Sequence, residues 1–190
     1  MELDDKELAK KVKQGDRHSF DVLVSRYKRR LYSKIYRMTR SHHITDELLQ
    51  ETFLKLYTNI HQYKEEYHFY PWLHRIAVNL TINYLKREKK RRKDRSLEAE
   101  MEEHYMQPVK HNNPFNPEAT FQRTERDGKI LAAMQKLTPI YRATLVLRVF
   151  DGLSYKEIAD TLNCNIGTVM SRLNRARSQL KDLLKEYIQI

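Results

Sequence analysis

The stretch that decides the fold lies at residues 151–169 and reads DGLSYKEIADTLNCNIGTV. Ser154 and Glu157 have the spacing of a capping box, in which the serine opens a helix and the glutamate binds back to its start. A turn at residues 163–165 separates this short helix from a longer one, and Ala159 is small enough for the two helices to cross closely. The arrangement predicts a helix-turn-helix.

The longer helix, from about Ile166, carries types of side chain that bind DNA on its outer side. Arginine can clamp a guanine edge, asparagine can read adenine, and serine or threonine can bind a base or a phosphate. The expected outward positions are Thr168, Met170, Ser171, Arg172, Asn174, Arg175, Arg177 and Ser178. A helical hairpin with a solvated basic face is the alternative interpretation.

Upstream of this stretch, another helix is expected to begin at Thr138 and Pro139, since proline suits a first helical turn. Its inner residues would be Tyr141, Leu145, Val146 and Val149. The turn at residues 151–152 would close this helix.

The N-terminal half also predicts helices. From Phe20 to Met38, apolar residues recur at three- and four-residue steps on one helical face, and basic residues such as Lys34 lie mostly off that face. A second helix is expected to start with Thr45 as its N-cap. A third is expected to begin at Pro71 and to run into the basic residues 86–95.

No strand pattern is convincing, so the fold class is all-α. Residues 96–120 hold three of the five prolines and read as a flexible linker. The chain is therefore divided into two small helical domains at residues 1–95 and 121–190, the second being the helix-turn-helix.

Composition narrows the classes of function. The chain has 36 Lys and Arg against 25 Asp and Glu, a net charge of +11, which favours nucleic acid, an anionic membrane or an acidic protein as partner. A single cysteine excludes a disulfide framework and a zinc site of clustered cysteines. The charged N-terminus has no signal peptide, and no run approaches the roughly 18 apolar residues of a membrane span, so a cytoplasmic location is expected.

Residues 69–79 form the first candidate site in the N-terminal half, because they mix aromatic and basic side chains. Single-stranded DNA stacks its bases on such rings while cations follow its phosphates. The alternative is that Phe69 and Trp72 only pack the core.

Residues 46–51 form the second candidate site, because they place Glu47 and Glu51 four residues apart on one helical face. This pair suits an acidic docking patch, a solvated surface or the metal site of a nuclease. A metal enzyme would need further ligands at compatible spacing.

Taken together, these motifs resemble the sigma-70 superfamily of bacterial RNA polymerase initiation factors, in particular its small extracytoplasmic-function (ECF) group. The resemblance covers about residues 20–93 and 123–184. It implies that the first domain binds core RNA polymerase and opens the −10 promoter element, that the second domain reads the −35 element, and that the chain is not an enzyme.

The resemblance also implies roles for individual residues. Core polymerase would be bound by Asp46, Glu47, Gln50, Glu51 and Phe53. The −10 element would be bound by Phe69, Tyr70, Trp72, Arg75, Asn79, Lys86 and Arg87. The −35 element would be bound by Arg148, Thr168, Met170, Ser171, Arg172, Asn174 and Arg175, with Arg148 on a phosphate.

Three positions depart from the family pattern: relatives often carry Asp at the positions of Glu47 and Asn83, and Arg or Lys at that of Met170. The implied partners are the β′ and β subunits of core RNA polymerase, promoter DNA and an anti-sigma factor, often a membrane-bound one. No cofactor and no small-molecule substrate are expected. A stand-alone helix-turn-helix regulator is the alternative function, but it would need neither the aromatic–basic segment nor the acidic docking motif.

Overall fold

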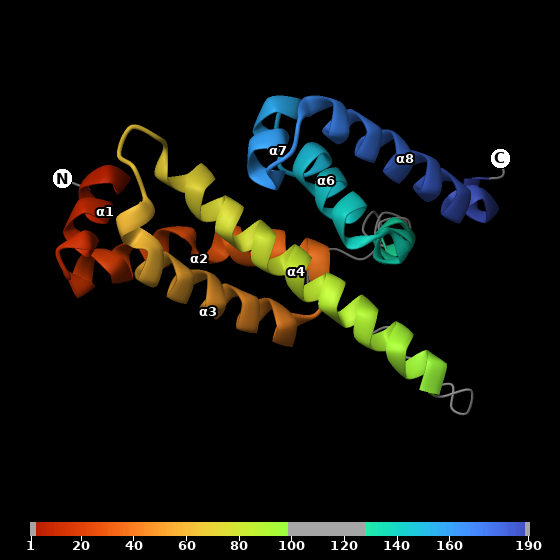
Figure 1. Ribbon diagram of the computed structural model, residues 1–190, viewed down its shortest axis with the longest axis horizontal. Helices are drawn as coiled ribbons and strands as arrows, with labels where there is room; N and C mark the ends of the chain where they lie inside the picture. Colours follow the sequence, from red (N-terminus) through yellow and green to blue (C-terminus); the bar gives the residue numbers. More distant parts are fainter. Residues whose placement is uncertain (1–2, 99–127, 189–190) are drawn as a thin grey trace, which may run out of the picture.

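The computed structural model describes residues 3–98 and 128–188, and all regular structure within these residues is helical (Figure 1). The all-α prediction is confirmed. The helices are α1 (Asp5–Lys13), α2 (Arg17–Thr39), α3 (His42–Asn59), the short 3₁₀ helix η1 (Ile60–Gln62), α4 (Phe69–Glu98), a helix at residues 128–136, α6 (Pro139–Val149), α7 (Tyr155–Leu162) and α8 (Ile166–Ile188). The predicted linker lies mostly outside the described residues, and α4 runs three residues into it.

The helices α1 to α4 form an N-terminal bundle around one apolar core. Leu23, Leu31, Leu56 and Leu73 are fully buried there, and each such side chain contributes about 1.5–3 kcal/mol by leaving water. The sequence analysis did not predict α1, because most of its residues are charged and only three, Leu8, Ala9 and Val12, are apolar. Its buried side is Leu8, Ala9 and Val12, and its Asp5 binds Tyr27 and Arg26 of α2.

The boundary between α2 and α3 corrects one prediction. Arg40 adopts a left-handed conformation (φ 57°) that ends α2, and Ser41 is the N-cap of α3. Thr45, the predicted N-cap, lies in the first turn of α3, fully buried, and its hydroxyl donates to the Ser41 carbonyl (2.6 Å). Serine and threonine are both good caps, so the local sequence did not decide between them. In the same way α4 begins at Phe69, two residues before Pro71.

The C-terminal bundle, residues 128–188, contains the helix-turn-helix at the predicted positions. Ser154 Oγ accepts from the Glu157 N–H (3.2 Å) and Glu157 Oε2 accepts from the Ser154 N–H (2.8 Å), so the capping box is formed. Asn163 takes the left-handed conformation (φ 47°) that ends α7. The Asn165 side chain accepts from the Thr168 N–H (2.7 Å) at the start of α8.

The prediction that Val149 lies on the inner side of α6 is wrong. Val149 is 60% exposed, whereas Leu147, which was not predicted, is fully buried. Val149 is the last residue of α6 and lies next to the turn, where the helix no longer packs on its neighbours.

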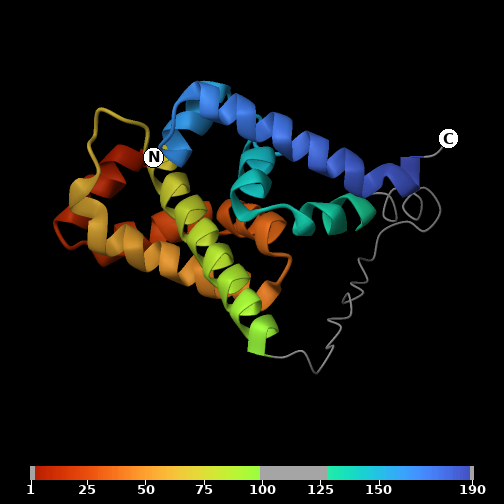
Figure 2. The ribbon, with the colours of Figure 1, turned by 45° about the vertical axis from the view of Figure 1, so that its right-hand side comes forward.

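The two bundles pack against each other through α2, α4, α6 and α7 (Figure 2). Met38 of α2 and Val78 and Ile82 of α4 belong to the same apolar cluster as the core of the C-terminal bundle. Lys34, expected to be solvated, is buried at this contact. The spacing of apolar residues in α2 predicts the side that packs inside the N-terminal bundle. It carries no signal for the second side of α2, which packs against α6 of the C-terminal bundle.

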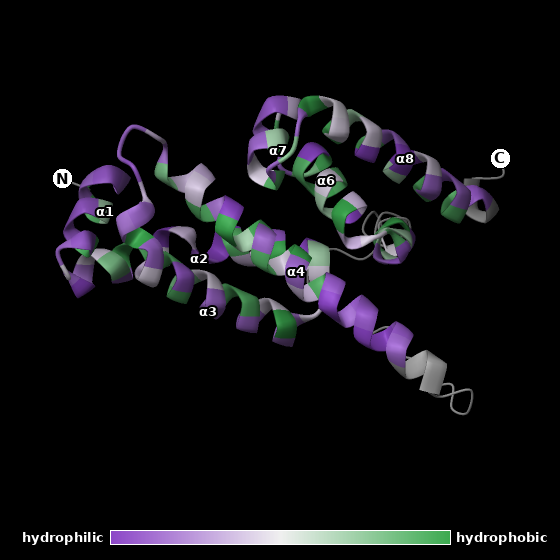
Figure 3. Ribbon diagram, viewed as in Figure 1, coloured by the Kyte–Doolittle hydropathy of each residue, from purple (hydrophilic) through white to green (hydrophobic). Residues whose placement is uncertain are grey.

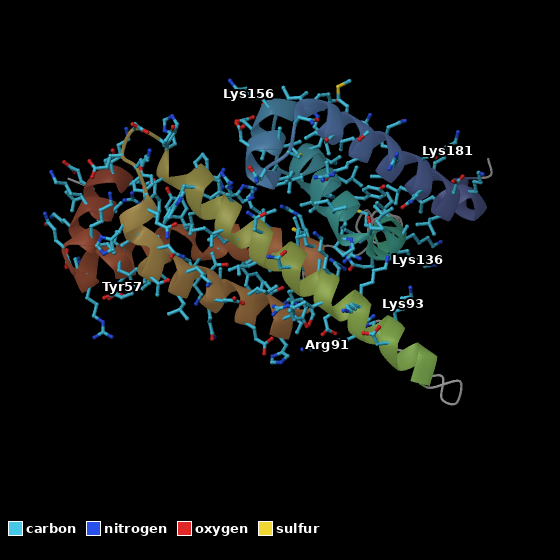
Figure 4. The ribbon with its side chains drawn as sticks, in the orientation of Figure 1. Tyr57, Arg91, Lys93, Lys136, Lys156 and Lys181 are labelled. Atoms are coloured by element: carbon cyan, nitrogen blue, oxygen red, sulfur yellow. The ribbon has the colours of Figure 1, made fainter. Side chains whose placement is uncertain are left out.

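The distal half of α4 projects beyond the N-terminal bundle. From residue 86 to 94 its side chains are charged and almost all exposed, and Figure 3 shows this end of the helix as hydrophilic. Arg91 and Lys93 mark it in Figure 4. Of the helices within residues 3–98 and 128–188, none is long and apolar enough to span a membrane.

Candidate nucleic-acid interface

The recognition helix α8 turns its inner side to the core through Val169, Leu173 and Ala176. The opposite side therefore faces water and exposes Met170, Ser171, Asn174 and Arg175, all four of them predicted DNA-binding residues. Met170 is 54% exposed, which is high for a large apolar side chain on a helix. This face carries polar and basic side chains of the kinds that bind base edges.

Five predicted −35 residues hold contacts within the protein. Two of them lie on the exposed side of α8: Ser171 Oγ donates to the Thr168 carbonyl (2.9 Å), and Arg175 Nη1 lies 3.5 Å from the Tyr141 hydroxyl.

The other three are half-buried. Thr168 is half-buried and donates both its N–H (2.7 Å) and its hydroxyl (2.8 Å) to Asn165 Oδ1, so it serves the start of the helix. Arg172 is half-buried with Nη1 3.5 Å from the Cys164 sulfur. Arg148 donates from Nη1 to the Leu153 carbonyl (2.8 Å), which braces the turn between α6 and α7.

The aromatic–basic segment divides into an inward and an outward set. Phe69 is 2% exposed and packs edge-on against Tyr63, with ring centroids 5.2 Å apart. Tyr70 lies between Tyr27 and His74, the Arg30 guanidinium lies 3.7 Å from its ring centroid, and burial raises its pKa to about 12. The packing interpretation, made for Phe69 and Trp72, therefore holds for Phe69. It holds in part for the half-buried Trp72, whose ring centroid lies 5.4 Å from that of Tyr63 and 5.9 Å from that of Phe69.

The outward set lies along α4. Arg75, Lys86 and Arg87 are exposed, and Asn79 and Trp72 are half-buried. From Arg75 to Arg87 this polar face extends about 18 Å, at 1.5 Å per residue. It can follow several nucleotides of a DNA strand.

The loop before α4 holds an exposed aromatic residue that the sequence analysis did not single out. Tyr67 is 63% exposed, and its carbonyl accepts from the Tyr63 hydroxyl (2.7 Å), which fixes the loop on the core. The signal for it in the sequence is an aromatic residue set among the charged residues 64–68.

The acidic face of α3 exposes Asp46, Glu47 and Gln50, with Glu51 half-buried beside them. Phe53 is instead in the core beneath this face, 8% exposed. Two apolar residues missed from the sequence continue the same face: Leu54 (62% exposed) and Tyr57 (49%), and Figure 4 labels Tyr57 at the edge of the bundle. Leu54 stands seven residues after Glu47, a spacing that returns to the same side of a helix.

The metal-site interpretation of α3 gains no ligands from the fold. Glu47 contacts His43, with Oε1 and Nε2 3.4 Å apart. In the described part of the chain no group of three or more His, Cys, Asp or Glu side chains is placed to hold a metal ion.

Comparison with known proteins agrees with this architecture. Residues 23–91 match the family "Sigma-70 region 2" and residues 127–180 match "Sigma-70, region 4". The ECF RNA polymerase sigma-E factor of Haemophilus influenzae is 33% identical over 184 residues, covering 97% of each chain.

Two solved structures share the fold. The complex of CnrH with the cytosolic domain of CnrY matches with a TM-score of 0.62 at 22% identity, covering 96% of this chain and 97% of CnrH. The sigma factor RpoE of Bartonella quintana, solved with the anti-sigma factor NepR, matches with a TM-score of 0.61 at 22% identity, covering 90% of this chain and 98% of that one. The resemblance seen in the sequence is confirmed: the chain belongs to the sigma-70 family as an ECF sigma factor, a protein that catalyses no reaction itself and directs RNA polymerase to promoters.

Proposed function

We propose that the outward face of α4 reads the −10 element as a single strand. The observation that carries this proposal is the row of Arg75, Asn79 and Lys86 on α4, with Arg75 and Lys86 exposed and Asn79 half-buried, together with the exposed Tyr67 in the loop before α4. Taking a base out of the stack costs a few kcal/mol, which ring stacking and hydrogen bonds to the base edge must offset. Tyr67 and the half-exposed Trp72 supply the rings, and Asn79 supplies an amide that can both donate and accept.

The buried aromatic residues have a different part in this proposal. Phe69 is buried in the bundle and the half-buried Tyr70 stacks on Tyr27, so they hold the start of α4 instead of stacking on DNA. Lys86 and Arg87 stand at the far end of the same face, where the charge continues to residue 93 and attracts phosphates without regard to sequence.

The −35 element is assigned to the exposed side of α8. Ser171, Asn174 and Arg175 present donors and acceptors to base edges, and Met170 presents an apolar surface suited to a thymine methyl group. Arg172 and Arg148, held by contacts inside the protein, position the helix and meet the phosphate backbone.

The exposed face of α3 is assigned to the binding of core polymerase, through the β′ and β subunits of the polymerase. Asp46, Glu47, Gln50 and Glu51 form the polar part of this surface, and Leu54 is its apolar centre. An exposed apolar residue ringed by charges is typical of a protein interface, where the centre loses its water and the rim steers the approach. Phe53 supports this face from beneath.

The chain is further assigned to the cytoplasm and to control by an anti-sigma factor. The support is that a chain of the same fold was solved in complex with the anti-sigma factor NepR. Membrane attachment would then come from that partner.

A matched pair of variants tests the −10 assignment. Asn79→Ala should reduce discrimination between −10 sequences by about tenfold, equal to one base-edge contact of 1–3 kcal/mol, and should leave the affinity for core polymerase unchanged. Asn83→Ala, an exposed asparagine one turn further along α4, should change neither. A loss of polymerase binding alone in Asn79→Ala would contradict the assignment.

A further inference from the structure

A groove of about 570 Å³ runs along α2 where this helix meets the turn between α6 and α7. Phe150 and Asp151 line it from the C-terminal bundle. The wall formed by α2 carries five basic residues: Arg26, Arg29, Arg30, Lys34 and Arg37. Pockets of roughly 300–1,000 Å³ have the size that takes a small molecule. The charge of this wall indicates that the molecule is an anion.

Only part of this positive charge is neutralised within the protein. Arg26 pairs with Asp5 of α1, and Lys34 pairs with Asp151. In the described part of the chain, the other three arginines of the wall make no ion pair with a carboxylate. The groove is therefore left with three positive charges that no carboxylate balances.

Asp151 adds no available negative charge to the groove. Its side chain is 1% exposed, Lys34 Nζ contacts Oδ1, and His74 Nε2 of α4 lies 3.3 Å from Oδ2. Burial alone would raise the pKa of Asp151, but its contacts with His74 and Lys34 outweigh burial and keep the pKa below its usual value. The carboxylate is thus charged and already occupied by these two partners.

Aromatic rings hold two of the three unpaired arginines in place. The Arg30 guanidinium lies 3.7 Å from the centroid of the Tyr70 ring, and the Arg37 guanidinium lies 5.2 Å from that of Phe150. A guanidinium that rests on a ring keeps the N–H donors of its edge for another partner, and this edge binds a phosphate through two parallel hydrogen bonds. Side chains that are fixed before the ligand arrives lose less freedom on binding, which favours affinity.

The positive charges of the groove act on one another. Burial lowers the pKa of Lys34, and the charges of Arg30 and Arg37 lower it further against the opposing contact with Asp151. Arg30 and Arg37 are two helical turns apart, about 10 Å along the axis at 1.5 Å per residue. An anion whose charge extends over this length relieves the repulsion at both positions. A compact ion such as sulfate reaches only one of them.

The groove ends at the contact between the bundles, which favours a short ligand. Met38 directly follows Arg37, is 2% exposed, and packs into the core cluster of the C-terminal bundle. A long nucleic-acid strand would have to pass through this contact, whereas a few linked phosphates would not. Phe150 is 41% exposed beside the arginines and offers a ring to an aromatic base.

We propose that this groove binds an oligophosphate, a chain of two or three phosphates that is either part of a nucleotide or inorganic. Arg30 and Arg37 bind it through the edges of their guanidinium groups, and Arg29 adds a third charge. Ser33, which also lines the groove, offers a hydroxyl donor. None of these residues is assigned above to promoter DNA or to polymerase, so the site is separate from those surfaces.

Calorimetric titration of the full chain tests this proposal. Inorganic triphosphate is added at a constant ionic strength of about 0.15 M, without magnesium, so that the screening of surface charge stays the same. It should bind at one saturable site, and sulfate should bind at least about tenfold more weakly. Arg30→Gln should weaken triphosphate about tenfold, the value of one charge-assisted contact. Arg17→Gln, an exposed arginine in the first turn of α2 outside the groove, should leave the affinity unchanged.

A second variant and a second ligand sharpen the result. Arg29 is exposed and makes no ion pair, so Arg29→Gln leaves the fold intact and should still weaken triphosphate several-fold. ATP is titrated in the same way. Tighter binding of ATP than of triphosphate, with the difference lost in Phe150→Leu, would identify the ligand as a nucleotide. Equal affinities would identify it as an inorganic oligophosphate.

Three results would overturn the proposal, with circular dichroism used to check that each variant keeps its helices. The first is the absence of saturable triphosphate binding. The second is an equal loss in Arg17→Gln and Arg30→Gln, since the binding would then reflect the diffuse charge of the chain. The third is displacement of triphosphate by a single-stranded oligonucleotide whose own affinity falls tenfold in Arg30→Gln, because the groove would then be a DNA site.

Discussion

Arg142 offers the sharpest test of how the fold is held together. Its guanidinium is buried, and it donates to Met38, Met134, Leu137 and both the side chain and the carbonyl of Gln135. Four of these five acceptors lie at the C-terminal ends of α2 and of the helix at residues 128–136. The fifth, the Leu137 carbonyl, directly follows the second helix. Arg142→Met keeps most of the side-chain volume and removes every donor.

The size of the effect follows from two opposing contributions. Burial lowers the pKa of Arg142 to about 10, which corresponds to roughly 3 kcal/mol spent on removing the charge from water, and this cost is absent in the methionine variant. The Met134 carbonyl still accepts from the Leu137 N–H (3.2 Å), and the other four acceptors, left without a donor, cost about 1.5 kcal/mol each. We therefore expect the free energy of unfolding to fall by about 2–4 kcal/mol.

Urea unfolding followed by circular dichroism measures this change. Arg148→Met, which loses one carbonyl contact, should cost about 1 kcal/mol, and the exposed Arg177→Met should stay within about 0.5 kcal/mol. Equal stability of the Arg142 and Arg177 variants would refute the reasoning, because it would mean that the buried contacts only balance the cost of burial.

Two further predictions concern DNA and pH. Arg175→Ala should weaken binding to a −35 duplex by about 1–3 kcal/mol in a titration at fixed salt, and an unchanged affinity across duplex sequences would remove Arg175 from the readers. Burial lowers the pKa of His74 in spite of the opposing contact with Asp151, the nearby charges of Lys34 and Arg30 lower it further, and the Tyr70 ring stacks on the imidazole. The unfolded chain then binds a proton at this position more readily, so the free energy of unfolding, measured with urea, should fall as the pH falls through about 6.5. The depressed pKa of Asp151 acts in the same direction at lower pH. His74→Gln should remove the dependence near 6.5, and a fully retained dependence would contradict its origin in His74.

Local signals predicted the helix-turn-helix almost completely. The Ser154–Glu157 capping box, the turn at Asn163 and the start of α8 each depend on residues within a few positions of one another. The outward side of α8 followed from the same periodicity. Such features are visible in a sequence because the partners that fix them are neighbours in the chain.

The contact between the bundles could not be predicted in this way. Lys34 and His74 look like solvated residues until Asp151, far along the chain, covers them. Likewise the sequence left Phe69 between packing and base stacking, and only its contact with Tyr63 decides for packing. Leu54 was within reach of the sequence, since its spacing from Glu47 places it on the acidic face, but an apolar residue on a helix is usually assigned to the core.

Polymerase-dependent transcription tests the central claim most directly. The purified chain is combined with core RNA polymerase, and the start sites of the transcripts are mapped on genomic DNA from the source bacterium. We expect the chain to bind core polymerase and transcription to start downstream of sites that share two separate upstream elements. Binding to DNA without association with polymerase, or starts that share a single element, would contradict it and favour a stand-alone helix-turn-helix regulator.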